Sequence, residues 1–129
     1  MRVLLADDDP HVQSAVRLLL EEEAGICLVA ECADADSLLE RVLCSNSNAI
    51  LIDWDLPGLE ARRELNRLRV GAPGCRVVVL CGRPEERDNA LRAGAESFVW
   101  KGDDPETLIG ALRAFDPATW PGQDHPVDG

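Results

Sequence analysis

An apolar run of four residues, Ala49 to Ile52, leads directly into a carboxylate, Asp53. A short apolar run with β-branched residues that is closed by a turn signal, here Pro57-Gly58, is typical of a buried strand in a parallel sheet. Burial of a carboxylate is costly unless another group compensates its charge. Because open α/β sheets bind ligands outside the carboxyl ends of their strands, Asp53 is a candidate site residue.

The run before Asp53 is one of five apolar runs that alternate with amphipathic helical patterns. The predicted strands are Val3–Ala6, Ile26–Ala30, Ala49–Ile52, Val77–Cys81 and Phe98–Trp100. The predicted helices begin near Pro10, Asp36, Leu59, Glu85 and Pro105. This alternation predicts an α/β fold, namely a flavodoxin-like (βα)5 doubly wound parallel sheet with strand order 2-1-3-4-5 in a single domain.

Length and composition bound the class of protein. We expect one domain over residues 1–116, followed by residues 117–129 as a linker or C-terminal tail, because this last segment is rich in Pro and Gly and lacks periodicity. The net charge of −11 argues against direct binding of nucleic acid or an anionic membrane. No apolar run approaches the length of a signal-peptide core or a membrane span.

The cysteines indicate a reducing compartment. The five cysteines are an odd number and lack the spacing of metal ligands, so we expect a reduced, cytoplasmic protein. Cys27 and Cys32 lie in or beside an apolar run, where a free thiol behaves as a small hydrophobe, and we expect both in the core.

Chemically reactive side chains follow four of the predicted strands. Asp7 and Asp8 follow the first strand and Asp53 the third, while Cys81 ends the fourth and Lys101, the only lysine, follows the fifth. Strands one and three are neighbours in the predicted order, so three carboxylates should meet at one edge with an ammonium opposite. Hard oxygen ligands of this kind suit Mg²⁺. An aspartate beside a metal and a lysine can act as a nucleophile and hold a phosphoryl group.

The motifs LLADDDP, LIDWDLPG, VVVLCGRPEE and ALRAGAESFVWKGDDPETL occur in this order along the chain. With them the chain resembles a two-component response-regulator receiver domain of the CheY-like superfamily, over about residues 1–115, and is most similar to the NarL/LuxR-type branch. The resemblance implies that Asp53 accepts a phosphoryl group from a phosphohistidine of a partner kinase. It also implies that Asp8 and Asp53 bind Mg²⁺ directly, Asp7 through water, and Asp55 through its backbone carbonyl.

The same resemblance assigns three further positions. Lys101 would contact the phosphoryl oxygens, and Phe98 would occupy the aromatic switch position. Cys81 stands where the family has Thr or Ser, and a thiol is a much weaker hydrogen-bond donor than a hydroxyl. Gly102 stands where many receivers have Pro after the lysine, which would loosen that loop.

Two other functions remain open on the residues alone. A pseudo-receiver would keep the fold and a protein-binding face without a phosphate switch, and Cys81 is its best support. A haloacid-dehalogenase-type phosphatase would use Asp53 and Asp55 as a D-x-D motif, but such enzymes place an acidic pair late, and here it comes early. We expect a phosphoacceptor signalling domain and not an enzyme.

The resemblance also implies partners. We expect a sensor histidine kinase as phosphodonor and a fused or downstream helix-turn-helix output domain. The chain ends about where that output domain begins in the NarL/LuxR-type branch, so a truncated protein is favoured over a stand-alone regulator. Arg87, Arg92 and Arg113 could form a face for a partner or for a second copy in a homodimer.

Overall fold

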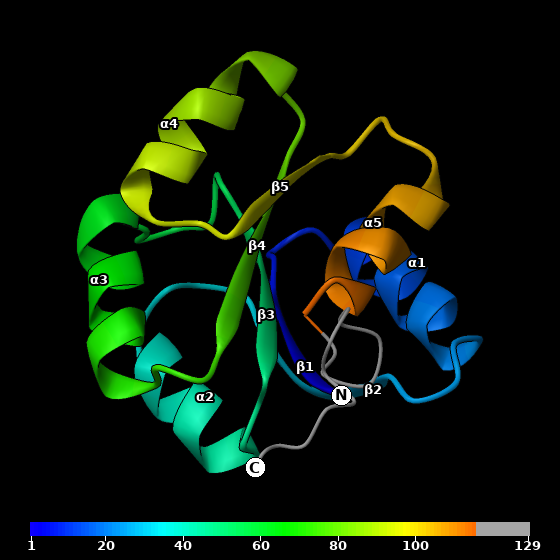
Figure 1. The fold of residues 1–129 in the computed structure, drawn as a ribbon, viewed down its shortest axis with the longest axis horizontal. Coiled ribbons are helices and arrows are strands. Elements are labelled where there is room, and N and C mark those ends of the chain that lie inside the picture. Colours follow the sequence, from blue (N-terminus) through cyan, green and yellow to red (C-terminus); the bar gives the residue numbers. More distant parts are fainter. Residues whose placement is uncertain (116–129) are drawn as a thin grey trace, which may run out of the picture.

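Five parallel strands form one sheet in the order β2-β1-β3-β4-β5. The structure, a computed structural model, describes residues 1–115, and the predicted tail at 117–129 lies outside these residues. Figure 1 shows the strands running side by side through the middle of the molecule. The strands are β1 (Arg2–Ala6), β2 (Cys27–Cys32), β3 (Ala49–Asp53), β4 (Arg76–Cys81) and β5 (Ser97–Trp100). The predicted α/β fold and strand order are confirmed.

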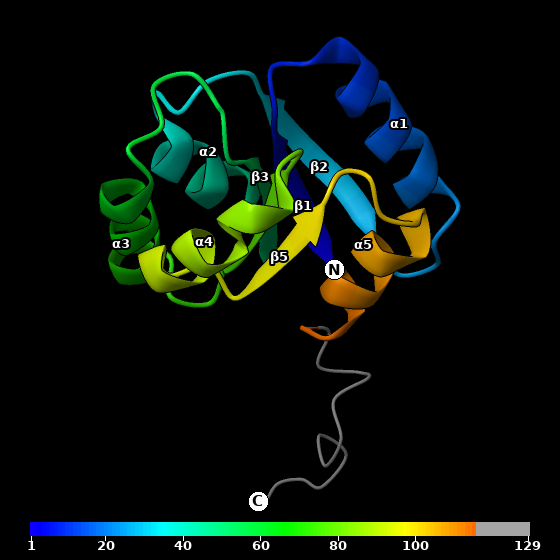
Figure 2. The same cartoon turned by 90° about the horizontal axis from the view of Figure 1, so that it is seen from above.

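Helices cover both faces of the sheet. The helices are α1 (Pro10–Glu21), α2 (Leu38–Ser45), α3 (Ala61–Gly71), α4 (Arg87–Ala93) and α5 (Pro105–Arg113), and a short 3₁₀ turn, η1 (Pro84–Glu86), precedes α4. Figure 2 shows α2, α3 and α4 on one face and α1 and α5 on the other. Among the described helices none is both long and apolar enough to cross a membrane.

The alternation of side chains along each strand divides the apolar interior into two cores. The α4-side core contains strand residues that face α2, α3 and α4, among them Leu4, Ala6, Ile50, Ile52, Val77, Val79, Cys81 and Phe98. The α5-side core contains the intervening residues that face α1 and α5, among them Val3, Leu5, Ala49, Leu51, Val78, Leu80 and Val99. Because both faces of β1, β3 and β4 are covered, these strands are almost continuously apolar.

Individual residues set where three of the helices begin. Asp9 caps α1 by accepting a hydrogen bond from the N–H of His11, and Pro10 occupies the first turn, as predicted. Asp104 caps α5 in the same way. The helix expected near Asp36 begins only at Leu38, because Ser37 has a left-handed backbone with φ of 61°.

Two expectations about β2 were wrong. The strand extends to Cys32 rather than ending at Ala30, because it pairs with β1 as far as Ala6. Cys27 is exposed and Cys32 only half-buried, so neither lies in the core as expected. The physical reason is that β2 is an edge strand of the sheet and is covered less completely than the central strands.

Candidate functional site

Three carboxylates converge at the carboxyl ends of β1 and β3. These two strands are neighbours, and their register pairs Ala6 with Ile52, so the residues that follow them emerge side by side. One carboxylate oxygen from each of Asp7, Asp8 and Asp53 lies within 4.8 Å of the others. Asp7 is fully buried and Asp53 is 4% exposed, whereas Asp8 is exposed. The predicted juxtaposition of these three acids is therefore present.

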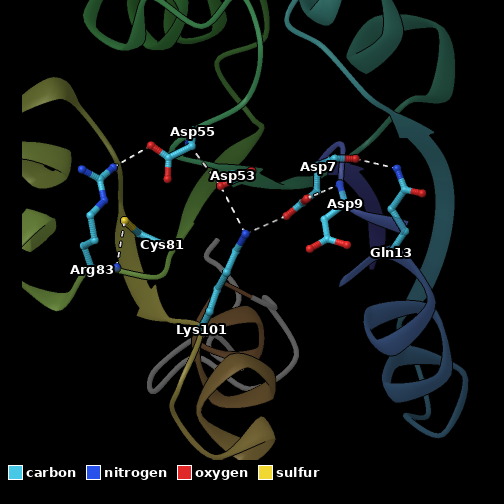
Figure 3. Close-up of polar contacts among 8 residues, drawn as sticks. All are labelled: Asp7, Asp9, Gln13, Asp53, Asp55, Cys81, Arg83 and Lys101. Carbon is cyan, nitrogen blue, oxygen red and sulfur yellow. Dashed lines mark hydrogen bonds and ion pairs between the residues drawn. The ribbon is translucent and has the colours of Figure 1, made fainter. Parts of the chain in front are cut away.

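Lys101 connects the two buried acids. Its Nζ lies 3.1 Å from Asp7 Oδ2 and 3.2 Å from Asp53 Oδ1. Figure 3 shows the lysine side chain pointing toward both carboxylates. The lysine side chain is 27% exposed, so it is less deeply buried than the two acids that it contacts. Its backbone N–H donates to the carbonyl of Cys81, which ties the loop after β5 to the end of β4.

The shared direction of these three side chains follows from the two-residue period of a strand. Asp7, Asp53 and Lys101 each stand two positions after a strand residue whose side chain lies in the α5-side core. All three side chains therefore point to the same face of the sheet as those core residues. The three core residues are Leu5, Leu51 and Val99, which precede Asp7, Asp53 and Lys101 respectively.

Backbone and side-chain donors hold the two buried acids in place. The N–H of Asp9 donates to Asp7 Oδ1 at 2.9 Å, and the N–H of Asp55 donates to Asp53 Oδ1 at 3.1 Å. Gln13 Nε2 donates to the backbone carbonyl of Asp7 at 2.5 Å. The contribution of Gln13 was not predicted, because a polar residue in the second turn of a helix carries no sequence signal for such a contact.

Burial and charge act in opposite directions on the two partners. Burial raises the pKa of Asp7, and it outweighs the lowering by the Asp9 N–H and by Lys101. Burial alone would lower the pKa of Lys101, but the hydrogen bond to Asp7 and the charge of Asp53 outweigh it and leave this pKa raised. Lys101 thus stays an ammonium, while the charge on Asp7 is compensated only in part.

The donor set fits a hard divalent cation. Asp7, Asp8 and Asp53 offer carboxylate oxygens alone, without the imidazole or thiolate ligands that zinc and copper prefer. Burial disfavours the charged form of Asp7, and a second cation beside Asp7 would stabilise that form. Asp8 is exposed, so this side of the acidic cluster faces solvent. Magnesium usually binds through one or two carboxylates and keeps several waters, which suits such a site.

Cys81 and Phe98 lie beside this acidic edge, in the α4-side core. The side chain of Cys81 is fully buried, and its Sγ accepts a hydrogen bond from the N–H of Arg83 at 3.4 Å. Phe98 is 6% exposed and belongs to the same core. Both side chains point to the face of the sheet that α4 covers, whereas Asp53 follows the strand residues of the opposite face. Cys81 and Phe98 therefore lie under α4 rather than among the acids.

Two side-chain contacts join the loop after β3 to the segment that precedes α4. Arg83 Nη2 lies 2.6 Å from Asp55 Oδ1, and Trp54 Nε1 donates to Glu86 Oε1 at 2.9 Å. The Trp54 hydrogen bond lowers the pKa of Glu86. The sequence places Arg83 and Glu86 near the site, because both follow closely after β4. It does not predict that Arg83 pairs with Asp55 or that Glu86 accepts from Trp54.

The position of the Trp100 ring accounts for the glycine at position 102. The indole folds back along the loop, and its Nε1 donates to the carbonyl of Gly82 at 3.2 Å. A Cβ at Gly102 would collide with this ring. Gly102 is therefore the residue that admits Trp100, and the side chain of Trp100, 38% exposed, lies over the loop after β4. Trp100 is not part of the buried core, although it shares a strand face with Phe98.

The arrangement suits the transfer of a phosphoryl group. Asp53 presents a carboxylate oxygen at the end of a rigid central strand, Lys101 places an ammonium beside it, and the neighbouring acids can hold a cation. Phosphoryl transfer depends mostly on positioning and on neutralising the charge of the phosphoryl oxygens.

Comparisons with known proteins agree with this geometry. Residues 3–113 match the family model described as a response regulator receiver domain. The nitrate/nitrite response regulator protein NarP of Escherichia coli (strain K12) is 31% identical over 115 residues, which are 88% of this chain and 54% of the relative. The chain spans about half the length of the first curated relatives that it matches.

Solved structures share the fold. A two-component response regulator of the LuxR family from Aurantimonas sp. SI85-9A1 is 29% identical with a TM-score of 0.79, and the match covers 88% of this chain and 82% of that chain. The isolated REC domain of RcsB from Salmonella enterica serovar Typhimurium, solved in the presence of the phosphomimetic BeF3-, has a TM-score of 0.80 at 24% identity. That match covers 95% of this chain and 94% of the other, and at this identity it shows the fold alone.

Proposed function

The chain belongs to the response regulator receiver domain family, and from this premise we propose that Asp53 accepts a phosphoryl group from a sensor histidine kinase. The family is one of signalling domains rather than of enzymes. The observation that carries the proposal is the position of Lys101, whose ammonium contacts the two most buried acids of the site at 3.1 and 3.2 Å.

Asp53, Asp55 and Lys101 would each contribute to the transfer of the phosphoryl group. A carboxylate oxygen of Asp53 attacks the phosphorus atom, the P–N bond of the phosphohistidine breaks, and the imidazole leaves with that electron pair. The Asp55 N–H, which donates to Asp53 Oδ1, orients the attacking carboxylate. Lys101 would bind a phosphoryl oxygen and offset its charge.

Mg²⁺ is the proposed metal. Asp7, Asp8 and Asp53 would hold it with the backbone carbonyl of Asp55, and the ion would supply charge neutralisation at the phosphoryl oxygens. The Asp9 N–H and the Lys101 ammonium both donate hydrogen bonds to the carboxylate of Asp7. These bonds fix the orientation of the carboxylate before any metal binds.

A pseudo-receiver is the second candidate, and the environment of Cys81 favours it. The thiol sits in the α4-side core, accepts the Arg83 N–H, and is a weak donor, so it offers little to a phosphoryl group on Asp53. The phosphatase interpretation is set aside, because the family is a signalling one and because Asp55, its general acid, is ion-paired with Arg83.

The proposed partners follow from the family. A histidine kinase would dock over the Asp53 edge, and a helix-turn-helix output domain would be controlled by it, as in the NarL/LuxR-type branch. Homodimer formation stays a prediction. Arg113 does not share a face with Arg87 and Arg92, because it lies on α5, and α5 and α4 cover opposite faces of the sheet (Figure 2).

A titration with beryllofluoride, a phosphoryl mimic, tests the proposal. Trp54 lies directly after Asp53, so its fluorescence should be quenched or shifted when the mimic binds, and this response should require Mg²⁺. Asp53→Asn should abolish the response, and Trp54→Phe should remove the signal without removing the binding. A native chain that gives no metal-dependent response would contradict the proposal and favour the pseudo-receiver.

A further inference from the structure

The arginines that lack a partner gather on two neighbouring helices. Within residues 1–115, the side chains of Arg62 and Arg69 on α3 and of Arg87 and Arg92 on α4 form no ion pair and no hydrogen bond. The arginines outside these two helices all have partners. Acids outnumber cations in this chain by 24 to 13, so a gathering of unpaired guanidinium groups needs an explanation.

Three of these arginines line one hollow between α3 and α4, which pack side by side on the same face of the sheet (Figure 2). This α3–α4 hollow has a volume of about 740 Å³. Arg62, Asn66 and Arg69 line it from α3, where their spacing places them along one stripe of the helix, and Arg92 lines it from α4. The volume lies within the range of about 300–1,000 Å³ that is typical of small-molecule sites.

We propose that the α3–α4 hollow binds the linear polyphosphate chain of a small anion, carried either by a nucleoside triphosphate or by free tripolyphosphate. The planar fork of a guanidinium matches phosphate oxygens in pairs, which makes arginine well suited to bind them. Because each phosphate of such a chain carries its own charged oxygens, the chain can engage several guanidinium groups at once. The residues that line the hollow are separate from the acidic site, so this inference does not depend on phosphoryl transfer to Asp53.

The charge of the two helices is opposite to that of the chain. Together α3 and α4 carry six arginines and two acids, Glu64 and Asp88, which gives a net charge of +4, whereas the whole chain carries −11. At physiological salt, exposed charges interact over about 8 Å. A compact anion in the hollow therefore responds mainly to the positive helices, whereas a long polyanion such as DNA would also meet the acidic remainder of the surface.

The guanidinium of Arg69 reaches from α3 to the end of α4. A Cβ at Gly94 would collide with Arg69 Nη2, so the guanidinium lies directly against the residue that ends α4. Gly94 has a φ of 119°, a conformation that favours glycine, and the lack of a side chain there leaves room for the guanidinium. Arg92 stands two residues before Gly94, so Arg69 and Arg92 line the same end of the hollow.

Glu60 is the one acid among the described residues that line the hollow. Its Oε2 lies 3.2 Å from Arg63 Nη2, and the side chains of Arg63 and Glu60 are 63% and 66% exposed. Solvent screens a pair that is this exposed, so the pair is weak. A bound polyphosphate would be repelled by Glu60, and removing this charge should therefore act in the opposite direction to removing an arginine of the hollow.

Titration calorimetry of the metal-free native chain with tripolyphosphate, ATP and inorganic phosphate, at about 0.15 M salt, tests the proposal. We expect tripolyphosphate and ATP to bind at one site per chain. Inorganic phosphate should bind at least about tenfold more weakly, because it can engage fewer guanidinium groups. Tighter binding of ATP than of tripolyphosphate would identify a nucleotide as the ligand, and equal binding would identify the polyphosphate chain alone.

Substitutions locate the binding in the hollow. Arg62→Gln and Arg92→Gln should each weaken tripolyphosphate binding about threefold, and Glu60→Gln should strengthen it about twofold. Arg17→Gln, which removes an exposed arginine of α1 that pairs with Glu31, is the matched control and should bind as the native chain does. The backbone amide NMR signals of α3 and α4 should shift on binding, and those of α1 should not.

A native chain that binds no polyphosphate, or Arg62→Gln and Arg92→Gln chains that bind it as the native chain does, would overturn the inference. A loss in Arg17→Gln equal to that in Arg62→Gln would do the same, because binding would then depend on overall charge alone. Tighter binding of a DNA duplex or of an acidic peptide than of tripolyphosphate would also overturn it. The proposed function of Asp53 would stand in each of these cases.

Discussion

Lys101 is the residue on which the electrostatics of the site depend. Asp7 and Asp53 are almost wholly buried, and Lys101 is the cation within ion-pair distance of both. Removing one partner from a buried ion pair leaves an uncompensated charge, which is far more costly than the loss of a surface pair. The partial exposure of Lys101 reduces this cost, because solvent screens part of the interaction.

We therefore predict that Lys101→Met lowers the free energy of unfolding of the metal-free chain by about 1–2 kcal/mol. The cost should be smaller in an Asp7→Asn background, because one of the two unpaired charges is then absent. Denaturant unfolding of the four variants of this cycle measures both effects. Arg17→Met, which breaks an exposed pair with Glu31, is the control and should cost less than about 1 kcal/mol. Equal losses in both Asp7 backgrounds would contradict the shared role of Lys101.

At the scale of helices and strands, two helical glycines differ in what surrounds them. A Cβ at Gly110 in α5 would meet nothing within 4 Å, whereas a Cβ at Gly71 in α3 would lie 2.8 Å from Leu39 Cδ2. The close approach at Gly71 lets α2 and α3 pack together on the same face of the sheet.

Gly110→Ala should raise the free energy of unfolding by about 0.5–1 kcal/mol, because alanine restricts the unfolded chain and costs nothing in space. Gly71→Ala should give less than this or a net loss, since Leu39 must move. Thermal and denaturant unfolding of the two variants test the difference. A stabilisation by Gly71→Ala as large as that by Gly110→Ala would show that Leu39 does not pack closely against Gly71.

The elements were predictable where burial leaves a clear pattern. The central strands are apolar throughout, so their order and the convergence of Asp7, Asp53 and Lys101 followed from position alone. The edge strand β2 carries a weaker pattern, which is why the exposure of Cys27 was missed. The pair of Arg83 with Asp55 and the folding back of Trp100 depend on loop conformations that no local periodicity encodes.

For the molecule as a whole, metal binding should be coupled to folding. The chain carries a net charge of −11, and its three clustered acids exist as a cluster only in the folded state. A ligand that binds only the folded state stabilises it by about 3 kcal/mol at a hundred times its dissociation constant. Bound Mg²⁺ should therefore raise the unfolding temperature in a concentration-dependent way.

Asp8→Asn separates charge repulsion from metal binding. Asp8 is the exposed member of the cluster, so this variant should make the metal-free chain more stable and should reduce the further stabilisation by Mg²⁺. Glu85→Gln, an exposed acid in η1, is the matched control and should leave the Mg²⁺ effect unchanged. Calorimetry with and without Mg²⁺ measures both variants, and an Asp8→Asn chain that responds to Mg²⁺ as the native chain does would exclude Asp8 as a ligand.

The most direct measurement is the mass of the chain after incubation with Mg²⁺ and a small acyl phosphate, which supplies the phosphoryl group without a kinase. We predict the addition of one phosphoryl group, which depends on Mg²⁺ and is lost on treatment with hydroxylamine. Peptide mapping should place this group on Asp53. A native chain that stays unmodified, or an Asp53→Asn chain that is modified equally, would contradict this prediction.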